Sequence, residues 1–524
     1  MGFLSLLPVI VAVVLALWTK RALFALFCGV FTGALLISYG NPWHSLVYVI
    51  DPLFLDSVAD RDSMKVILFS LLVASTVEIM RVGKGTQALV ELIAGFATTR
   101  RRALLGTWFA GLVVFFDDYA NCLIVGSSMR PITDRLKISR EKLAYLVDST
   151  AAPVATLALI STWIGYEVSL IDEAFQAIES TKLLEAGLIE MTAEGPTKVN
   201  AYAFFMEGLP YRFYPILALV FGLILAISTR DFGPMHQAEM MALQESEPEV
   251  EPVDKNRIWL GILPILLLIG IAGFDLYHQG ITKAPEAKTI FEIIGAADGY
   301  DAMLKGSIAS TTAAILLAVL YKIPTKNITK GIQEGSERLF EAILILILAW
   351  SIGSVMKELG SADYLVQVLD GSIAPEYLPS LVFVLAAGIA FATGTSFGTM
   401  GTLMPLALPL VVQSGASYEI ILAVSAAVLS GATWGDHCSP ISDTTVLSSA
   451  GADCDHAEHV RTQLPYALVS GIISLVFCSL PIGFGLHWGS AVLLGTLACI
   501  SAVFILGKKV EQSNQISTKA ELFS

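Results

Sequence analysis

Long apolar stretches recur along the whole chain, and short charged segments separate them. Typical stretches are LLPVIVAVVLALW at 6–18, ILALVFGLILAIS at 216–228, AILILILAWSIG at 342–353 and AVLLGTLACISAVFILG at 491–507. A helix needs about 20 apolar residues to cross the hydrocarbon core of a bilayer. The pattern therefore predicts an all-α protein that crosses a membrane many times.

Hydropathy and turn residues together define the segments that cross or enter the membrane. Most of the 32 Lys and Arg residues lie in every second connection between these segments. Because basic connections stay in the cytoplasm, we predict a multi-pass protein of the inner (plasma) membrane, with its N-terminus outside and its C-terminus in the cytoplasm. The segments are 3–18, 21–39, 64–80, 103–129, 143–164, 213–229, 258–277, 304–321, 340–357, 379–412, 419–450, 464–485 and 488–507.

Composition agrees with this location. The chain is 55% hydrophobic and only 15% charged, whereas soluble domains have about 25% charged residues. The formal net charge of −14 says little about partners, because acidic and basic residues lie in different segments. We expect the lipid bilayer as the surroundings and no nucleic acid as a partner.

Two segments begin and end on the same side of the membrane. Segment 103–129 has basic residues at both ends and FFDDYANC (115–122) in its middle. Segment 379–412 has no basic flank, and its middle reads TGTSFGTMG (393–401), a composition typical of unwound backbone. We interpret both as re-entrant hairpins with polar tips, one entering from each face.

A crossing with a polar interruption follows each hairpin. LVDSTAAPVATL (146–157) interrupts segment 143–164, and TWGDHCSPISDTT (433–445) interrupts segment 419–450. Pro153 in the first interruption and Pro440 in the second each remove a helical hydrogen bond and disfavour helix just before themselves. Both crossings are therefore predicted to be broken helices.

The order of these units predicts two inverted repeats, each with one re-entrant hairpin and one broken transmembrane helix. Irregular backbone at membrane depth and inverted repeats are typical of secondary transporters. Segment 165–212 is predicted to lie outside the membrane, as a cap or a dimer contact. The predicted units are an N-terminal transmembrane helix (1–20), repeat 1 (21–229), a charged cytoplasmic linker (230–257), a connecting helix (258–277), repeat 2 (278–485), and a final helix with a cytoplasmic tail (486–524).

The candidate cation- and proton-binding residues lie at the hairpin tips and the breaks. A charged side chain at the centre of a membrane helix costs about 2.5–3.5 kcal/mol, so Asp residues there are expected to function in transport. Na⁺ is a hard cation and prefers oxygen ligands, and a subset of the candidates is expected to bind it. The candidates are Asp117, Asp118, Asn121, Asp148, Ser149, Thr150, Thr393, Thr395, Ser396, Asp436, His437, Ser439, Ser442, Asp443 and Thr444.

Several candidates also have a purely structural interpretation. Asp117 or Asp118 could cap the hairpin turn, and Asp443 could cap the helix that resumes after the second break. His437 could be a hydrogen-bonded core residue or a proton carrier, because imidazole titrates near neutral pH. A partly dehydrated carboxylate holds its proton more tightly, which lets H⁺ and Na⁺ compete for it.

The cysteine and histidine pattern indicates neither a disulfide framework nor a cofactor. The six Cys residues show no paired spacing, and no cofactor is expected beyond the transported ions. The polar residues of 453–459 are predicted to lie in a solvated inner loop. No closed zinc pattern is formed by His437, Cys438, Cys454, His456 and His459.

Two long stretches resemble a known family. TWGDHCSPISDTTVLSSAGADCDHAEHVRTQLPYAL (433–468) is similar to the characteristic stretch of the NhaC family of Na⁺/H⁺ antiporters, within the ion transporter superfamily. FFDDYANCLIVGSSMRPITDRLKISREKLAYLVDSTAAPVA (115–155) resembles its counterpart in the first half. The resemblance implies a fold with two hairpins, a scaffold and a transport part, elevator-like movement, and sodium efflux driven by proton entry. Some relatives exchange organic anions, amino acids or drugs.

The sequence favours an antiporter that exchanges Na⁺ or Li⁺ for H⁺ by alternating access. A homodimer is a possible assembly. The alternative is a Na⁺- or H⁺-coupled transporter of a small carboxylate or amino acid, of the malate or lactate type. The absence of Arg and Lys from the site segments favours a bare cation. An enzyme is disfavoured, because the sequence has no GxSxG or HExxH element.

Overall fold

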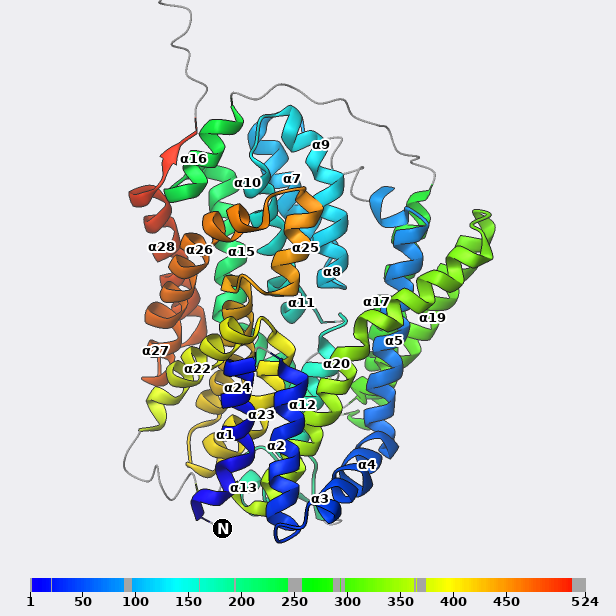
Figure 1. Ribbon diagram of the computed structural model, residues 1–524, viewed down its shortest axis with the longest axis vertical. Coiled ribbons are helices and arrows are strands. Elements are labelled where there is room, and N and C mark those ends of the chain that lie inside the picture. The colour runs from blue at the N-terminus through cyan, green and yellow to red at the C-terminus, as the bar shows by residue number, and fades with distance from the viewer. Residues whose placement is uncertain are drawn as a thin grey trace, which may run out of the picture.

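The chain folds almost entirely into helices, as the computed structural model shows (Figure 1). The structure describes residues 2–19, 21–88, 97–159, 161–192, 195–243, 257–285, 293, 297–361, 364 and 374–510. Two short antiparallel pairs are the strands found in these residues: β1 (Met191–Thr192) with β2 (Gly195–Pro196), and β3 (Arg230–Asp231) with β4 (Lys508–Lys509). The prediction of an all-α protein is confirmed.

Many of these helices are suited to a membrane. Eight helices in the described residues are long and apolar enough to cross one, or up to ten if each sharply bent helix pair counts as one span. The prediction of a polytopic membrane protein is confirmed. The eight are α5 (Arg61–Val82), α17 (Ile258–Lys283), α19 (Gly299–Leu320), η6 with α22 (Pro375–Thr393), α23 (Ser396–Gln413), α24 (Tyr418–Cys438), α26 with η7 and α27 (His456–Gly483) and α28 (Trp488–Leu506).

One side of the molecule is a bundle of α5, α17, α19 and α20, seen at the right in Figure 1. One end of this bundle has a small hydrophobic core of its own, separate from the main core. Helix α20 (Thr325–Leu359) is a continuous helix of 35 residues. The stretch 322–339 was expected as an inner connection, but it is mostly helix, because no Pro or αL residue interrupts α20 before Gly360.

The small core at the end of the bundle consists of Ile79, Leu260, Ala314, Ala318, Ile323 and Ile328.

The predicted hairpins are two helix–turn–helix units. In the first, the chain turns after α7 (Arg100–Val113) and returns through α8 (Asp118–Ala120), η3 (Asn121–Val125) and α9 (Gly126–Arg135). In the second, α22 (Leu378–Thr393) and α23 are joined at Gly394, whose φ of +68° favours glycine. Thr99 and Thr395 cap the helices that follow them through their hydroxyl oxygens.

Both predicted helix breaks are present. Residues 149–151 separate α10 (Arg140–Asp148) from α11 (Ala152–Leu157), and Pro153 lies in the first turn of α11. Residues 439–442, which include Pro440, separate α24 from α25 (Asp443–Ala452). Proline prevents the helix from continuing through either point. The inverted-repeat relation between the two halves stays a prediction.

The stretch after the first break differs from the expected outer segment. Helix α12 (Ile164–Gln176) begins beside both hairpin turns and is largely buried against α20 and α23. The more peripheral elements of 165–212 come after α12. The remaining elements are η1 (Gly2–Leu6), α1 (Leu7–Thr19), α2 (Ala22–Ile37), α3 (Pro42–Tyr48), η2 (Val49–Phe54), α4 (Leu55–Ala59), α13 (Ser180–Glu185), α14 (Ala201–Gly208), η4 (Leu209–Tyr211), α15 (Phe213–Ser228), α16 (Gly233–Ala242), η6 (Pro375–Tyr377), α26 (His456–Ile473), η7 (Ser474–Ser479) and α27 (Leu480–Gly483).

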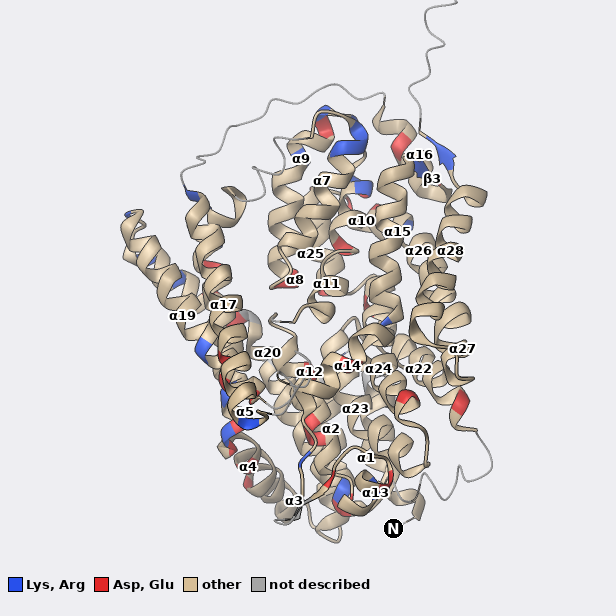
Figure 2. Cartoon of the chain, turned by 180° about the vertical axis from the view of Figure 1, so that it is seen from behind, with Lys and Arg blue, Asp and Glu red and all other residues tan. Residues whose placement is uncertain are grey.

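The start of the predicted linker 230–257 is folded. Strand β3 pairs with β4 beyond α28, and Asp231 binds the buried Lys142 of α10 at 2.5 Å. Residues 244–256 and the tail 511–524 lie outside the described residues. Lys and Arg gather at the end of the molecule formed by α7, α9, α16 and β3, and the N-terminus lies at the opposite end (Figures 1 and 2).

Candidate functional site

The two breaks and the two hairpin turns meet in the interior. Glycines allow each hairpin to approach the second broken helix closely. A Cβ on Gly451 of α25 would overlap the carbonyl oxygen of Cys122 in η3, and one on Gly435 of α24 would overlap that of Ala387 in α22. No other residue fits such contacts without backbone movement. These glycines position the polar hairpin turns against the polar break.

The second hairpin contacts the second break through Asp436. The Ser396 hydroxyl, at the start of α23, donates to Asp436 Oδ2 at 2.8 Å. Asp436 is 2% exposed, and its Oδ1 has no hydrogen-bond partner among the described residues. The turn of the second hairpin and the second break are therefore in contact, and one oxygen of this buried carboxylate has no partner among the described residues.

Asn121 joins the first hairpin to the first break. Its Nδ2 donates to the carbonyl oxygens of Gly111 at 2.7 Å, Thr150 at 2.9 Å and Val114 at 3.2 Å. The Oδ1 atom of this buried side chain has no partner in the described part of the chain. The amide thus fixes the turn of the hairpin and leaves one oxygen available as a ligand.

Asp148, the last residue of α10, connects the two halves of the site. Its Oδ2 accepts from Gln463 Nε2 at 2.6 Å and from Thr445 Oγ1 at 3.1 Å, and it lies 3.5 Å from His459 Nε2. The side chain is 1% exposed, and Oδ1 is unpartnered within the described residues. The first break is therefore linked directly to α25 and α26.

Asp443 lies on the open side of the site. Its carboxylate accepts from the Tyr119 hydroxyl of the first hairpin and from the backbone N–H of Thr444. Asp443 is exposed, in contrast to Asp436. Ser442, not Asp443, precedes the first turn of α25, and its side chain makes no capping hydrogen bond. Asp443 is thus the first helical residue and faces outward.

His437 is held in the core by three groups. Its Nδ1 shares a hydrogen bond with the Tyr214 hydroxyl at 2.5 Å, and its ring stacks on Tyr145 with centroids 6.2 Å apart. Gln463 Nε2 donates to its backbone carbonyl at 2.7 Å. These contacts fit the interpretation of His437 as a hydrogen-bonded core residue. Its Nε2 atom has no partner among the described residues.

Other predicted residues bond locally. Asp117 accepts from Ala120 N at 2.7 Å and caps α8, and Asp118, one residue further on, is buried as well. The hydroxyls of the remaining candidates bond within one or two turns of the chain. These are Ser149 and Thr150 to Leu146 O, Thr393 to Ile389 O, Thr395 from Gly398 N, Ser439 from Ile441 N, and Ser442 with Thr444.

Part of the site was not predicted from the sequence. His459 was expected in a solvated loop, but it is fully buried on α26 and contacts both Asp148 and Ser448. His459 and Gln463 are four residues apart, so they share one face of the helix. Tyr466, Ser470 and Ser474 continue that polar stripe along α26 and into η7. This spacing of polar residues is the sequence signal that could have predicted a buried polar face on α26.

A buried ion pair lies beside the first broken helix. Arg212, just before α15, donates to Glu167 Oε2 of α12 at 2.7 Å and to Thr156 Oγ1 of α11 at 2.8 Å, and both charged side chains are 1% exposed. Its guanidinium also stacks on Phe205. A basic residue is therefore close to the site after all, but its charge is already paired.

The site offers oxygens rather than a cluster of classical metal ligands. Within the described ranges, no three His, Cys, Asp or Glu side chains are grouped so as to hold a metal ion. Carboxylate, amide and hydroxyl oxygens instead line the meeting point of hairpins and breaks. Such groups suit a weakly held, hard cation that must also be released.

Comparison with known proteins shows the family of the chain. The model of the Na⁺/H⁺ antiporter family matches residues 154–480, which include the second hairpin and the second break. The chain belongs to the Na⁺/H⁺ antiporter family. This antiporter is therefore a membrane transporter and not an enzyme, and the resemblance predicted from the sequence is confirmed.

Individual relatives show how broad the family is. An uncharacterized protein of Haemophilus influenzae is 32% identical over 88% of both chains. The malate-2H⁺/Na⁺-lactate antiporter of Bacillus subtilis is 30% identical over 33% of this chain and 36% of its own. The Na⁺/H⁺ antiporter NhaC of the same organism is 24% identical over 30% of this chain and 34% of its own.

A solved structure supports the fold. The YdaH transporter of Alcanivorax borkumensis aligns with a TM-score of 0.55, covering 88% of this chain and 89% of that one. At 13% identity the likeness concerns the fold alone. The helical transporter architecture of this antiporter thus has a counterpart among solved structures.

Replacing Gln463 by Leu is expected to lower the rate of Na⁺-driven proton exchange about tenfold. The Nε2 group bonds both Asp148 and the His437 carbonyl, and an unsatisfied buried acceptor costs about 1–3 kcal/mol. The exchange rate in liposomes measures the effect. Gln333→Leu on the exposed face of α20 is the matched control, and equal rates in both variants would contradict the role of Gln463.

Proposed function

We propose that this antiporter exchanges Na⁺ or Li⁺ for H⁺ by alternating access, with the cation bound at the break between α24 and α25. The observation that best supports this site is Asp436, a buried carboxylate held by Ser396 with one oxygen open in the described structure. A buried charge without a partner is strongly unfavourable. A cation or a proton removes that cost, and only one of them can do so at a time.

Asp443 and Tyr119 complete the site on its open side. Asp443 is exposed and bonded to Tyr119 of the first hairpin, so a cation that arrives from this side meets Asp443 before Asp436. The two carboxylates flank the break from opposite ends. Competition between Na⁺ and H⁺ for this pair couples the two fluxes, since binding of one displaces the other.

Two neighbouring carboxylates are proposed to take part in the proton exchange. Asp118 and Asp148 are buried close to the first break and the first hairpin. Asp148 is linked to α25 through Thr445, so a change of charge at Asp148 is felt by the helix that begins with Asp443. These groups are proposed to exchange the proton together with Asp436.

A second cargo is a small carboxylate or amino acid moved with Na⁺ or H⁺. The Bacillus subtilis malate-2H⁺/Na⁺-lactate antiporter is a relative, and the start of α23 offers backbone N–H groups with the hydroxyls of Thr395 and Ser396, which suit a carboxylate. Arg212 is paired with Glu167 and offers no free counter-charge. The bare cation is therefore the leading proposal.

Liposomes with a trapped pH dye separate the two cargoes. Adding NaCl outside is expected to raise the internal pH at once, because each entering Na⁺ exchanges for departing H⁺. LiCl is expected to do the same. A response that requires malate, lactate or an amino acid in addition to Na⁺ would overturn the leading proposal in favour of the second cargo.

The proposed location is the inner membrane, with the N-terminus outside and the C-terminus in the cytoplasm. The gathering of Lys and Arg at one end of the molecule and the position of the N-terminus at the other support this orientation (Figures 1 and 2). Labelling of single cysteines from each side of intact cells tests it. A homodimer is proposed as the assembly, and light scattering of the purified protein tests it.

A further inference from the structure

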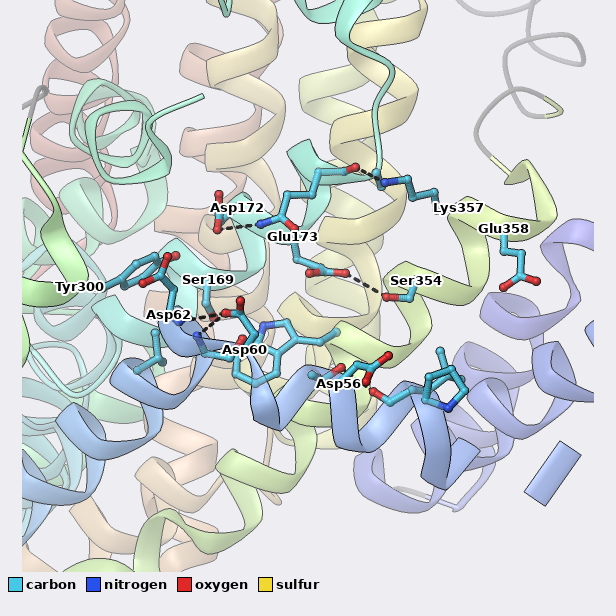
Figure 3. A pocket seen from close by; sticks show the side chains of 18 of the residues that line it. Asp56, Asp60, Asp62, Ser169, Asp172, Glu173, Tyr300, Ser354, Lys357 and Glu358 are labelled. Carbon is cyan, nitrogen blue, oxygen red and sulfur yellow. Dashed lines mark hydrogen bonds between the residues drawn. The ribbon is translucent and has the colours of Figure 1, made fainter. Parts of the chain in front are cut away.

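An acidic vestibule lies at the end of the molecule opposite the basic end. A cavity of about 560 Å³ is enclosed by the α4–α5 corner, α12 and α20. Figure 3 shows Asp172 and Glu173 of α12 near Asp60 and Asp62 of the α4–α5 corner, with Ser354 and Lys357 of α20 along another wall. A second cavity of about 640 Å³ shares Asp60, Asp62, Asp172 and Tyr300 with it. The two form one vestibule, whose acidic lining raises the local concentration of cations.

Helix α12 connects this vestibule to the ion site. Tyr166, Ser169 and Glu173 lie on one face of the helix, because they are three and four residues apart. Ser169 and Glu173 line the vestibule, whereas Tyr166 contacts the second hairpin. Ser169 is three residues from Tyr166, and three residues of helix span about 4.5 Å. The vestibule therefore ends about one helical turn from the residue that contacts the second hairpin.

An aromatic cluster fills that short interval. The Tyr166 hydroxyl donates to the Phe397 carbonyl at 2.5 Å, and the two rings meet edge to face at 4.7 Å. The Trp163 ring packs on Phe397 at 5.0 Å. Trp163 and Tyr166 are 1% and 3% exposed. Phe397 is the residue after Ser396, so the cluster lies directly beside the group that bonds Asp436.

The start of α12 also contacts the first hairpin. The backbone N–H of Thr162 donates to the carbonyl of Phe116 at 3.0 Å, one residue before Asp117. The segment 162–166 thus bridges both hairpin turns. The contacts of segment 162–166 therefore close the site toward the vestibule, whereas Asp443 is exposed on the side of α25.

We propose that Trp163, Tyr166 and Phe397 are the outer barrier of the transport path, and that the acidic vestibule is the route by which cations reach the site when this contact opens. The proposal rests on the proposed cation exchange. A packed aromatic contact excludes a hydrated ion, as hydrophobic constrictions do in channels. Opening requires that the second hairpin and α12 separate, which breaks the Tyr166–Phe397 hydrogen bond and the ring contacts.

Leakage of Na⁺ tests the barrier. In liposomes without a pH gradient, Phe397→Ala and Tyr166→Ala are expected to raise the downhill leak of radioactive Na⁺ about tenfold and to lower the number of protons exchanged per Na⁺. The matched control is Phe175→Ala, an aromatic residue of α12 that is as buried as Tyr166 but lines the vestibule and packs on Phe204 instead. The control is expected to keep the coupling of the wild type.

Thiol labelling tests the same barrier without reference to the cargo. A membrane-impermeant thiol reagent added outside is expected to modify Gln176→Cys, at an exposed position of the vestibule, in every background. It is expected to modify Thr399→Cys, one turn beyond Ser396 on α23 and fully buried, only when Phe397→Ala is also present. Mass spectrometry reads each position separately from the native cysteines.

Each outcome decides the proposal. Unchanged leak and unchanged labelling of Thr399→Cys would overturn it, and so would equal leak in Phe397→Ala and Phe175→Ala, which would make the cluster ordinary packing. A folded Phe397→Ala variant with neither leak nor exchange would also overturn it. If the wild type showed no Na⁺-driven proton movement but the labelling followed the expected pattern, the barrier would stand and the proposed cargo would fail.

Discussion

Replacing Asp436 by Asn is expected to reduce Na⁺-driven proton exchange at least about a hundredfold, to the level of empty liposomes. The variant keeps the shape of the side chain and its bond from Ser396, but it loses the charge that attracts the cation and the site that takes the proton. Two unit charges about 4 Å apart interact by about 4 kcal/mol at an effective dielectric constant of about 20, and a hundredfold loss corresponds to about 2.7 kcal/mol. The internal pH dye measures the rate.

Asp117→Asn is the matched control for this result. Asp117 caps α8 by accepting from Ala120 N, and Asn caps a helix as well as Asp does. Exchange is therefore expected to continue in this variant. Exchange by Asp436→Asn with the Na⁺ dependence of the wild type would show that the cation binds elsewhere, and loss of exchange in both variants would place the first hairpin in the coupling.

The fold could be predicted wherever the decisive signal is local. Pro153 and Pro440 end helices whatever surrounds them, and basic residues at both ends of 103–129 require the chain to turn back. The course of α12 could not be predicted in this way. Glu167 makes the start of that helix look like an exposed segment, and only Arg212, 45 residues further along, allows it to be buried.

The site residues, too, could be predicted only where the signal is local in the sequence. Asp436 and Asp148 were found because a carboxylate in an apolar crossing is conspicuous. His459 and Gln463 were missed because their contact with Asp148 spans more than 300 residues of sequence. The polar stripe on α26 shows that one face of the helix is buried against polar groups. It does not show that those groups belong to α10.

Replacing Arg212 by Met is expected to destabilise the protein by about 3–5 kcal/mol, the usual cost of leaving a buried charge without its partner. Arg212 donates to Glu167, to the Thr156 hydroxyl and to the Thr156 carbonyl, so its loss strands a carboxylate and a carbonyl at the end of α11. Met fills a similar volume beside Phe205. A lower Tm in detergent, with exchange in liposomes measured alongside, tests the expectation.

Removing the second charge as well is expected to restore part of this loss. In Glu167→Gln with Arg212→Met, no uncompensated charge remains, and the amide oxygen introduced at position 167 can still accept from Thr156, whose hydroxyl is 2.5 Å from Glu167 Oε1. The double variant should therefore be more stable than Arg212→Met alone, because neutralising a stranded carboxylate recovers most of its desolvation cost. Additive losses in the two single variants would mean that the pair does not act as a unit. In that case α11 and α12 are joined by packing and hydrogen bonds, and the charge of Arg212 has another purpose at the site.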